Sequence, residues 1–294
     1  MLIYFQEGYV MKNLLNEISA EYKNLTPSQQ KVAQYLCNNL KEATLLNLVN
    51  IAKKAKVSEA TVTRFVNKLG FSGFREFKQE FGQIVFQELL TTKKLAESAE
   101  ILEGHGAIFK EIANGDIENI QNFKKRLSYE TFESTVEKLS EARSIYILGL
   151  RSCYSLSFYL AFNLRYFLHS VKLIKLGIGD LPEQLQKIGP DDALVVISFR
   201  RYTREVVKIT EKIREKGANI IAITDSDLSP IAQLADKTLI VQTKIITYIE
   251  SHTAPMCLIN ALIAAIALKE KHKAFSALQK LENEFKQFET YVDY

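Results

Sequence analysis

The apolar positions between residues 25 and 86 recur every three or four residues, which predicts a set of amphipathic helices. Two of these helices are separated only by a tight turn at Val57 and Ser58, so this stretch has the layout of a helix-turn-helix. The first helix is expected over 48–56, and the second is expected to begin after Ser58 and to end before Gly70. The positions predicted to pack between the two helices are Leu48, Ile51, Ala52, Ala55, Val62, Phe65, Val66 and Leu69.

Capping residues support these boundaries. Ser58 is a good N-cap, because its hydroxyl can accept a hydrogen bond from a free amide of the first turn. Gly70 is placed to end the second helix as the glycine that follows its C-cap. Upstream, Thr26, Pro27 and Gln29 predict another helix start, with a cap, a proline in the first turn and a capping box. A compact helical domain is therefore expected near the N-terminus.

From residue 144 the pattern changes to short apolar runs that alternate with helical segments. Such runs are typical of buried parallel strands, and the alternation predicts a parallel sheet covered by helices on both faces. Strands are expected at 144–149, 171–176, 193–198, 219–224 and 238–241. Helices are expected at 152–169, 203–216, 229–235 and 253–268, followed by a charged tail that contains phenylalanines.

The predicted fold is therefore a two-domain one: an all-α helix-turn-helix domain, and an α/β domain with a parallel sheet flanked by helices. A length of 294 residues agrees with two domains. A helical connector is expected between them, with a break at Gly104 to Gly106. The predicted boundaries are 11–90 for the helical domain, 91–143 for the connector and 144–294 for the α/β domain.

Charge is concentrated in the helical domain. The whole chain carries a formal net charge of +4. The segment from Lys41 to Lys78 alone has eight basic and three acidic residues, a local charge of +5. Lysine and arginine contacts to phosphates give nucleic-acid affinity, whereas contacts to base edges give specificity. Double-stranded DNA is therefore the predicted partner of this domain.

In a helix-turn-helix the second helix enters the major groove. The candidates for its groove face are Thr61, Thr63, Arg64, Asn67 and Lys68, with Ser58 near the DNA backbone. The candidates for phosphate contacts are Lys53, Lys54, Lys56 and Arg75. The alternative is an ordinary solvated pair of helices, which the KKAK run alone would favour. The N-cap, the small side chains of the first helix, the turn length and the charge together favour DNA binding.

Two strand ends in the α/β domain lead directly into expected helices, and both loops combine arginines with hydroxyl groups. Ligands of parallel sheets bind beyond the carboxyl ends of the strands, where helix N-termini favour an anion. Arginine side chains there can grip a carboxylate or a phosphate with two hydrogen bonds. The candidate effector-binding residues are Arg151, Ser152, Cys153, Ser198, Arg200, Arg201 and Thr203. The alternative is that Ser152 and Thr203 only cap their helices and the arginines only face solvent.

Other chemistry has less support. Glu250 and His252 precede the last apolar helix and could reach the same edge as a catalytic base, but loop and capping roles are the favoured interpretation. No catalytic residue is assigned, and the chain is not expected to be an enzyme. The three cysteines and four histidines are scattered, so neither a disulfide framework nor a metal site is predicted, and no cofactor motif is present.

The N-terminus and the apolar runs bear on location. The first ten residues lack a positively charged n-region, so no signal peptide is expected. The longest apolar run, 254–268, is short for a membrane span. The expected location is the cytoplasm, without membrane association.

Both halves together resemble the RpiR/MurR family of bacterial transcriptional regulators, which join a helix-turn-helix domain to a sugar isomerase (SIS) domain. The resemblance covers about residues 25–268. Its motifs are Leu25-Thr-Pro-Ser-Gln, Val57-Ser-Glu-Ala-Thr-Val-Thr-Arg-Phe, Lys68-Leu-Gly-Phe-Ser-Gly-Phe-Arg-Glu-Phe-Lys, Ala218-Asn-Ile-Ile-Ala-Ile-Thr-Asp and Ser229-Pro-Ile-Ala-Gln-Leu-Ala-Asp. The resemblance implies a homodimer or tetramer on a symmetric operator, and an effector in the SIS domain that in many members is a phosphosugar.

The departures from the family pattern fall in the two loops. The phosphate loop of the family resembles S-x-S-G-x-T-x-E, and here Arg200 and Arg201 replace its second serine and its glycine. The loop after the first strand resembles G-x-G-A-S, and here Arg151 replaces a glycine and Cys153 a serine. Side chains at glycine positions fill space beside the backbone, and added arginines favour a planar anion. The sequence therefore predicts a carboxylate-bearing or otherwise anionic metabolite.

The predicted function is sequence-specific DNA binding controlled by this small anionic effector. One alternative is a phosphosugar isomerase with an added DNA-binding domain, which the altered phosphate loop disfavours. The other is a SIS domain that binds no ligand and serves only for dimerisation. The operator, the effector and the choice between repression and activation stay open.

Overall fold

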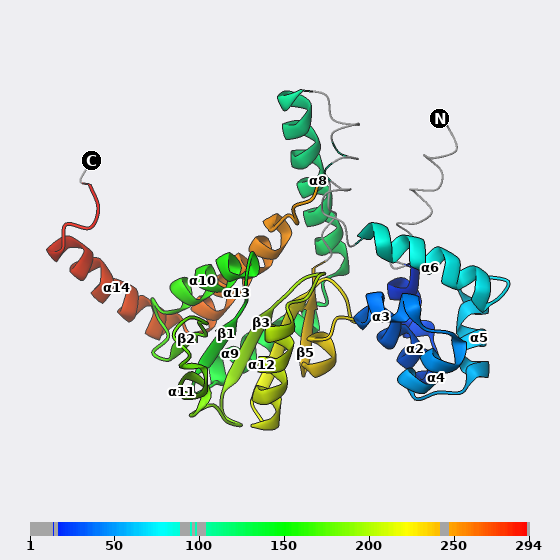
Figure 1. The fold of residues 1–294 in the computed structure, drawn as a ribbon. Helices are drawn as coiled ribbons and strands as arrows, with labels where there is room; N and C mark the ends of the chain where they lie inside the picture. Colours follow the sequence, from blue (N-terminus) through cyan, green and yellow to red (C-terminus); the bar gives the residue numbers. More distant parts are fainter. Residues whose placement is uncertain are drawn as a thin grey trace. The chain divides into compact units, whose positions relative to one another are not determined.

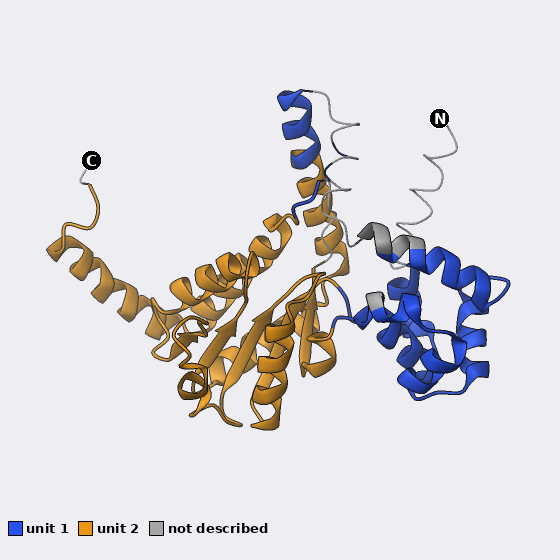
Figure 2. Cartoon of the chain, viewed as in Figure 1, with its two compact units in different colours: residues 1–112, 226–229, 245–249 blue, residues 113–225, 230–244, 250–294 orange. Residues whose placement is uncertain are grey.

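The computed structural model describes residues 14, 17–88, 95, 98, 104–241 and 247–292. The chain divides into two compact units, shown in blue and orange in Figure 2. Unit 1 contains residues 1–112, 226–229 and 245–249, and unit 2 contains the rest of the chain. Because each unit has its own core, the two are described separately.

Unit 1 is helical, as predicted. Its elements are the 3-10 helix η1 (Tyr22–Asn24) and the helices α2 (Pro27–Asn38), α3 (Leu40–Leu45), α4 (Leu48–Ala55), α5 (Glu59–Lys68) and α6 (Phe74–Glu88). Thr26 forms the expected capping box with Gln29, and the Ser58 side chain accepts a hydrogen bond from Thr61 N at 3.3 Å. Gly70 has a φ of +90°, which fits the glycine that follows a helix end. The short helix α3 was not predicted.

The core of unit 1 holds α4 and α5 together. Val62, Phe65 and Val66 of α5 are fully buried, and they pack in one cluster with Ile51 and Ala52 of α4. These are residues that the helical spacing assigned to the inner face. Burial of one face therefore fixes which side of α5 stays in contact with solvent.

Unit 2 is built on a five-stranded sheet (Figure 1). The strands are β1 (Ile145–Leu148), β2 (Val171–Leu173), β3 (Ala193–Ile197), β4 (Asn219–Thr224) and β5 (Lys237–Ile240), all parallel in the order β2-β1-β3-β4-β5. The helical elements are α8 (His105–Arg126, which begins among residues grouped with unit 1), α9 (Tyr129–Glu141), α10 (Cys153–Leu164), α11 (Leu181–Leu185), α12 (Arg204–Glu215), η2 (Ala232–Leu234), α13 (Thr253–Lys269) and α14 (Lys271–Gln287).

Alternate residues of each strand face opposite layers, because successive side chains of a strand point to opposite faces. Ile145 and Ile147 of β1 pack in the cluster formed with α9, α10 and α13. Tyr146 and Leu148 pack in the other cluster, which includes Ile209 of α12. The predicted fold class, a parallel sheet flanked by helices, is confirmed.

Several predicted boundaries differ from the structure. The helix expected over 152–169 ends at Leu164, and the segment 229–235 contains only a three-residue 3-10 helix. The charged tail forms α14, in which Ala274 is the buried residue and Phe275 is 69% exposed. Phe288, directly after the helix, is 77% exposed. Among the described residues no single helix is long and apolar enough to cross a membrane, although α13 and α14, bent by 103°, pass that test as a pair.

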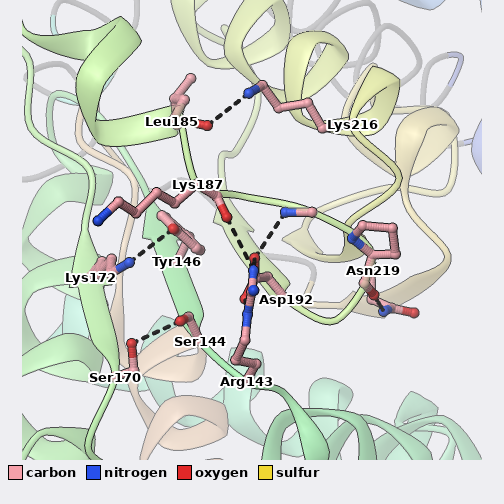
Figure 3. Close-up of polar contacts among 12 residues, drawn as sticks. Arg143, Ser144, Tyr146, Ser170, Lys172, Leu185, Lys187, Asp192, Lys216 and Asn219 are labelled. Carbon is pink, nitrogen blue, oxygen red and sulfur yellow. Dashed lines mark hydrogen bonds and ion pairs between the residues drawn. The ribbon is translucent and has the colours of Figure 1, made fainter.

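The amino-terminal edge of the sheet is closed by internal polar pairs (Figure 3). Arg143 donates from Nε to Asp192 Oδ1 at 3.0 Å and from Nη2 to Oδ2 at 2.6 Å, and Gly189 N donates to Oδ2 at 2.8 Å. Burial acts to raise the pKa of Asp192, but these hydrogen bonds outweigh it, so the pKa lies below its usual value. Asp192 therefore stabilises the fold through these internal hydrogen bonds.

Candidate functional site

Helix α5 presents the predicted groove residues on its solvent side. Arg64, Asn67 and Lys68 are exposed, whereas Thr61 and Thr63 are half-buried. Ser58, at the start of the helix, is exposed as well. The predicted groove residues therefore lie on the solvent side of α5 or at its margin.

Several of these side chains are held by hydrogen bonds to main-chain carbonyl oxygens. Arg64 donates from Nε to the Ala60 carbonyl oxygen at 3.2 Å, and Thr63 donates to the Glu59 carbonyl oxygen at 3.1 Å. Lys68 Nζ donates to the Asn24 carbonyl oxygen at 2.6 Å. A side chain restrained in this way loses less conformational entropy when it binds.

The predicted phosphate contacts lie around this helix. Lys53, Lys54, Lys56 and Arg75 are all exposed. Lys54 forms an ion pair with Glu42 at 2.8 Å, so part of its charge is already neutralised. Lys56 ends α4 with a φ of 55°, a left-handed conformation that places it in the turn of the helix-turn-helix.

In unit 2 the two candidate loops lie at the same edge of the sheet. β1 and β3 are neighbours, with Leu148 opposite Val196, and their carboxyl ends lead into α10 and α12. The strand order reverses between β1 and β3, because β2 lies on one side of β1 and β4 beyond β3. Such a switch point is where open parallel sheets form a ligand crevice. The structure thus brings together the two loops that the sequence selected.

Two arginines in these loops have backbone conformations that normally favour glycine. Arg151 has a φ of 57° and Arg201 a φ of 68°. Both residues are exposed, and each lies shortly before a helix of twelve residues. A left-handed conformation costs a residue with a Cβ about 1–2 kcal/mol. The loops therefore keep a glycine-type path while bearing arginine side chains, and strain of this kind clusters at functional sites.

The hydroxyl groups of the loops are not used as caps. Ser152 and Thr203 occupy the N-cap positions of α10 and α12, but neither side chain makes a capping hydrogen bond. The capping alternative for these two residues is therefore not what the structure contains. Ser198 is 4% exposed and lies at the end of β3.

Cys153 is packed into the core next to the site. Its side chain is 7% exposed, and burial raises the pKa of its thiol to about 11, with the charges of Glu250 and Asp225 adding to the effect. The backbone of Phe199 hydrogen-bonds to this thiol and so links the two loops. Cys153 offers little surface to a ligand, so its contribution is to fix the position of the loop.

Asp225 and Tyr202 were not identified from the sequence. Asp225 follows β4, the strand next to β3, and its Oδ2 lies 3.8 Å from Arg200 Nε. The Tyr202 hydroxyl donates to Asp225 Oδ1 at 2.8 Å. A lone aspartate after a strand gives no sequence signal until the strand order is known.

Glu250 and His252 also reach this part of the sheet. The His252 ring lies 6.3 Å from the Phe199 ring, and burial lowers the pKa of His252. His252 stands at the N-cap of α13 but makes no capping hydrogen bond, and its Nε2 is buried without a partner among the described residues. His252 therefore occupies the cap position that the sequence suggested, and its main-chain carbonyl accepts from Met256 N at 2.8 Å, but its ring does not cap the helix. No group of three or more His, Cys, Asp or Glu side chains in the described part of the chain could hold a metal ion.

Known protein families match sequence in both units of the chain. The helix-turn-helix domain of the rpiR family matches residues 12–86, and the SIS domain matches residues 138–265. The HTH-type transcriptional regulator HexR of Pseudomonas aeruginosa is 28% identical over 269 residues, which are 88% of this chain and 90% of that protein.

Solved structures agree with this assignment. The sugar isomerase domain of an RpiR transcription factor from Sphaerobacter thermophilus is 25% identical, with a TM-score of 0.56, and covers 59% of this chain and 97% of that one. The NanR protein of Vibrio vulnificus, solved in complex with ManNAc-6P, is 16% identical with a TM-score of 0.57 over 94% of this chain and 98% of that one, a likeness of fold alone. The chain belongs to the RpiR family, and it is a helix-turn-helix transcriptional regulator that carries a SIS domain.

Proposed function

We propose that this regulator binds a specific DNA operator through α5, and that a small anionic metabolite at the β1/β3 edge of the SIS domain controls this binding. The observation that carries the proposal is the pair of arginines, Arg151 and Arg201, held in left-handed conformations before α10 and α12. Backbone strain of this kind lowers stability, and it is found mainly where the strained residues serve a functional site. Two helix N-termini at the same edge add positive potential for an anion.

The anion is proposed to carry a carboxylate. NanR binds a phosphosugar, and a phosphosugar is therefore the competing ligand class. The guanidinium group pairs with planar carboxylates through two parallel hydrogen bonds. Arginine binds a phosphate in the same way, so the preference for a carboxylate rests on the positions of Arg151 and Arg201. Both replace glycines of the family pattern, and their side chains fill space beside the backbone that a phosphate would approach.

A thermal-shift screen of organic acids against sugar phosphates tests the ligand class. An organic acid is expected to raise the melting temperature of the wild-type protein and to have a much smaller effect on Arg200→Ser/Arg201→Gly. Stabilisation by a sugar phosphate alone, retained in the double variant, would contradict the proposed ligand. An unchanged melting temperature with every compound would favour the alternative of a ligand-free dimerisation domain.

Arg64→Ala tests the groove face of α5. An operator is first selected from a random duplex library. The variant is then expected to bind it between about fivefold and about 150-fold more weakly, because one base contact is typically worth about 1–3 kcal/mol. Arg75→Ala is the matched comparison: it should weaken binding to all sequences alike and reduce the salt dependence. Unchanged operator affinity of Arg64→Ala in a gel-shift assay would contradict the assignment of Arg64 to the groove face.

A homodimer is part of the proposal. The rings of Tyr154, Phe158, Phe162 and Tyr166 form a row along α10 and the turn that follows it, with successive centroids 6.4, 5.9 and 5.2 Å apart. Phe158 and Phe162 are 47% and 46% exposed, and contiguous apolar surface of this kind is typical of an interface. A dimer also carries two helix-turn-helix domains, which can bind two operator half-sites about one helical turn of DNA apart. A single-chain molar mass by light scattering would contradict the dimer.

One observation favours a second candidate, the phosphosugar isomerase. Glu250 and His252 lie at the same edge as the arginines, and His252 Nε2 is buried without a partner among the described residues. A base and a histidine near a bound sugar are what proton transfer between adjacent carbons needs. Turnover of hexose or pentose phosphates by the purified protein would establish this activity. The absence of turnover with both classes of sugar phosphate would contradict the isomerase and leave the regulator as the proposed function.

A further inference from the structure

Asp225 places a carboxylate of the protein itself at the proposed anion site. β4 ends at Thr224, and it pairs with β3 so that Ile223 lies opposite Ile197. Asp225 therefore lies beside the loop that carries Arg200 and Arg201. Its side chain is only 13% exposed, so its charge faces the loop more than the solvent.

The contacts of Asp225 show how it is oriented. The Tyr202 hydroxyl donates to Oδ1 at 2.8 Å, and the Thr224 hydroxyl donates to the same oxygen at 3.3 Å. The other oxygen, Oδ2, is turned toward Arg200 Nε. Two hydroxyl groups thus hold one oxygen of the carboxylate while the second faces the guanidinium group.

The Arg200–Asp225 pair is looser than the structural pair at the other end of the sheet. Arg143 and Asp192 make two hydrogen bonds of 2.6 and 3.0 Å. The contact between Arg200 and Asp225 is 3.8 Å, beyond hydrogen-bond distance. An ion pair at this distance is attractive, yet it lacks the directional bonds that would make it permanent. The first pair is built to persist, and the second is suited to exchange.

We propose that Asp225 is the resident counter-anion of the effector site. It neutralises Arg200 when the site is empty, and an incoming anion takes its place beside the guanidinium group. This inference rests on the proposed function and adds that a carboxylate of the protein competes with the effector for Arg200. The apparent Kd for the effector is then the intrinsic Kd divided by the fraction of molecules in which Arg200 is released from Asp225.

The test is anion binding by Asp225→Asn in the full chain, measured by calorimetry with inorganic phosphate and with succinate. Asparagine keeps the shape and can still accept from Tyr202, but it carries no charge. If Asp225 holds Arg200 about nine-tenths of the time, the variant binds each anion about tenfold more tightly. Tyr202→Phe, which removes one of the two hydroxyl donors to Asp225 and keeps the carboxylate, should give a smaller change in the same direction.

Asp191→Asn is the control for charge. It alters the net charge equally, and Asp191 is an exposed residue at the amino-terminal end of β3, the opposite edge of the sheet. Its anion affinity should match that of the wild type. A gain in both asparagine variants would show a general charge effect and would overturn the proposal.

The remaining outcomes separate this inference from the proposed function. Equal or weaker anion binding by Asp225→Asn, with normal binding by the wild type, would overturn the counter-anion role and leave the anion site intact. No binding of phosphate, succinate or the organic acids by any form, with operator binding retained, would overturn the anion site and the inference with it.

Discussion

Gly149→Ala is expected to destabilise the SIS domain by about 3 kcal/mol, at the upper end of the usual cost of overpacking a core. A Cβ at this position would lie 2.1 Å from Ser157 Oγ and 2.8 Å from the carbonyl oxygen of Cys153. Both atoms belong to the first turns of α10, so the methyl group pushes the start of that helix away from the end of β1. The melting temperature should fall by roughly 6–12 °C, at 2–4 °C per kcal/mol for a domain of this size.

The control is Gly177→Ala, where an added Cβ meets nothing within 4 Å and the melting temperature should hardly change. Ser157→Ala provides a second check, because the Ser157 hydroxyl is fully buried and has no hydrogen-bond partner among the described residues. Its removal should be neutral or stabilising, and it should rescue part of the loss in Gly149→Ala/Ser157→Ala. Equal melting temperatures for Gly149→Ala and Gly177→Ala would show that β1 and α10 do not need this close approach.

Much of the fold was predictable because local chemistry decides it. Ser58 and Thr26 cap helices for reasons contained in four consecutive residues, and both caps are present. The two arginine loops were predictable as one site for a similar reason. Both follow apolar strands, and the carboxyl ends of parallel strands meet at one edge whatever their order.

What could not be predicted depends on strand order and backbone conformation. Asp225 is significant only because β4 lies next to β3, and nothing local to Thr224 and Asp225 encodes that pairing. The burial of Cys153 likewise depends on how α10 packs against the sheet. Ser152 and Thr203 have the residue types of caps, yet their hydroxyls do not cap. Tertiary packing overrides the local preference at these positions.

The conformations of Arg151 and Arg201 could not be read from the residues themselves, because arginine does not favour a positive φ. Comparison with the family pattern did mark both as replacements for glycine. The structure adds that the backbone kept the path of the glycine. Replacing these two arginines with glycine should therefore raise stability and lower ligand affinity.

Arg151→Gly/Arg201→Gly is expected to lower affinity for the anionic effector by at least about a hundredfold while leaving the protein slightly more stable. Each arginine lost removes a charge-assisted hydrogen bond worth about 1.5–3 kcal/mol. Release of about 1–2 kcal/mol of strain at each residue exceeds the roughly 0.5–1 kcal/mol entropic cost of a glycine. The melting temperature should rise by a few degrees, and calorimetry with the organic acid selected in the screen measures the loss of affinity.

The opposite signs make this variant informative. Arg165→Gly/Arg204→Gly is the matched control, since it removes two exposed arginines from the same domain whose backbone is helical or near helical. It should lose stability, because glycine has a low helix propensity and because Arg165 Nε donates to the Val171 carbonyl oxygen at 3.0 Å. A double variant at 151 and 201 that is also destabilised would show that the arginines themselves hold the loops in place. If it were stabilised with unchanged ligand affinity, the strain would have to serve the loop path alone, and the anion would have to bind through the helix N-termini without either guanidinium group.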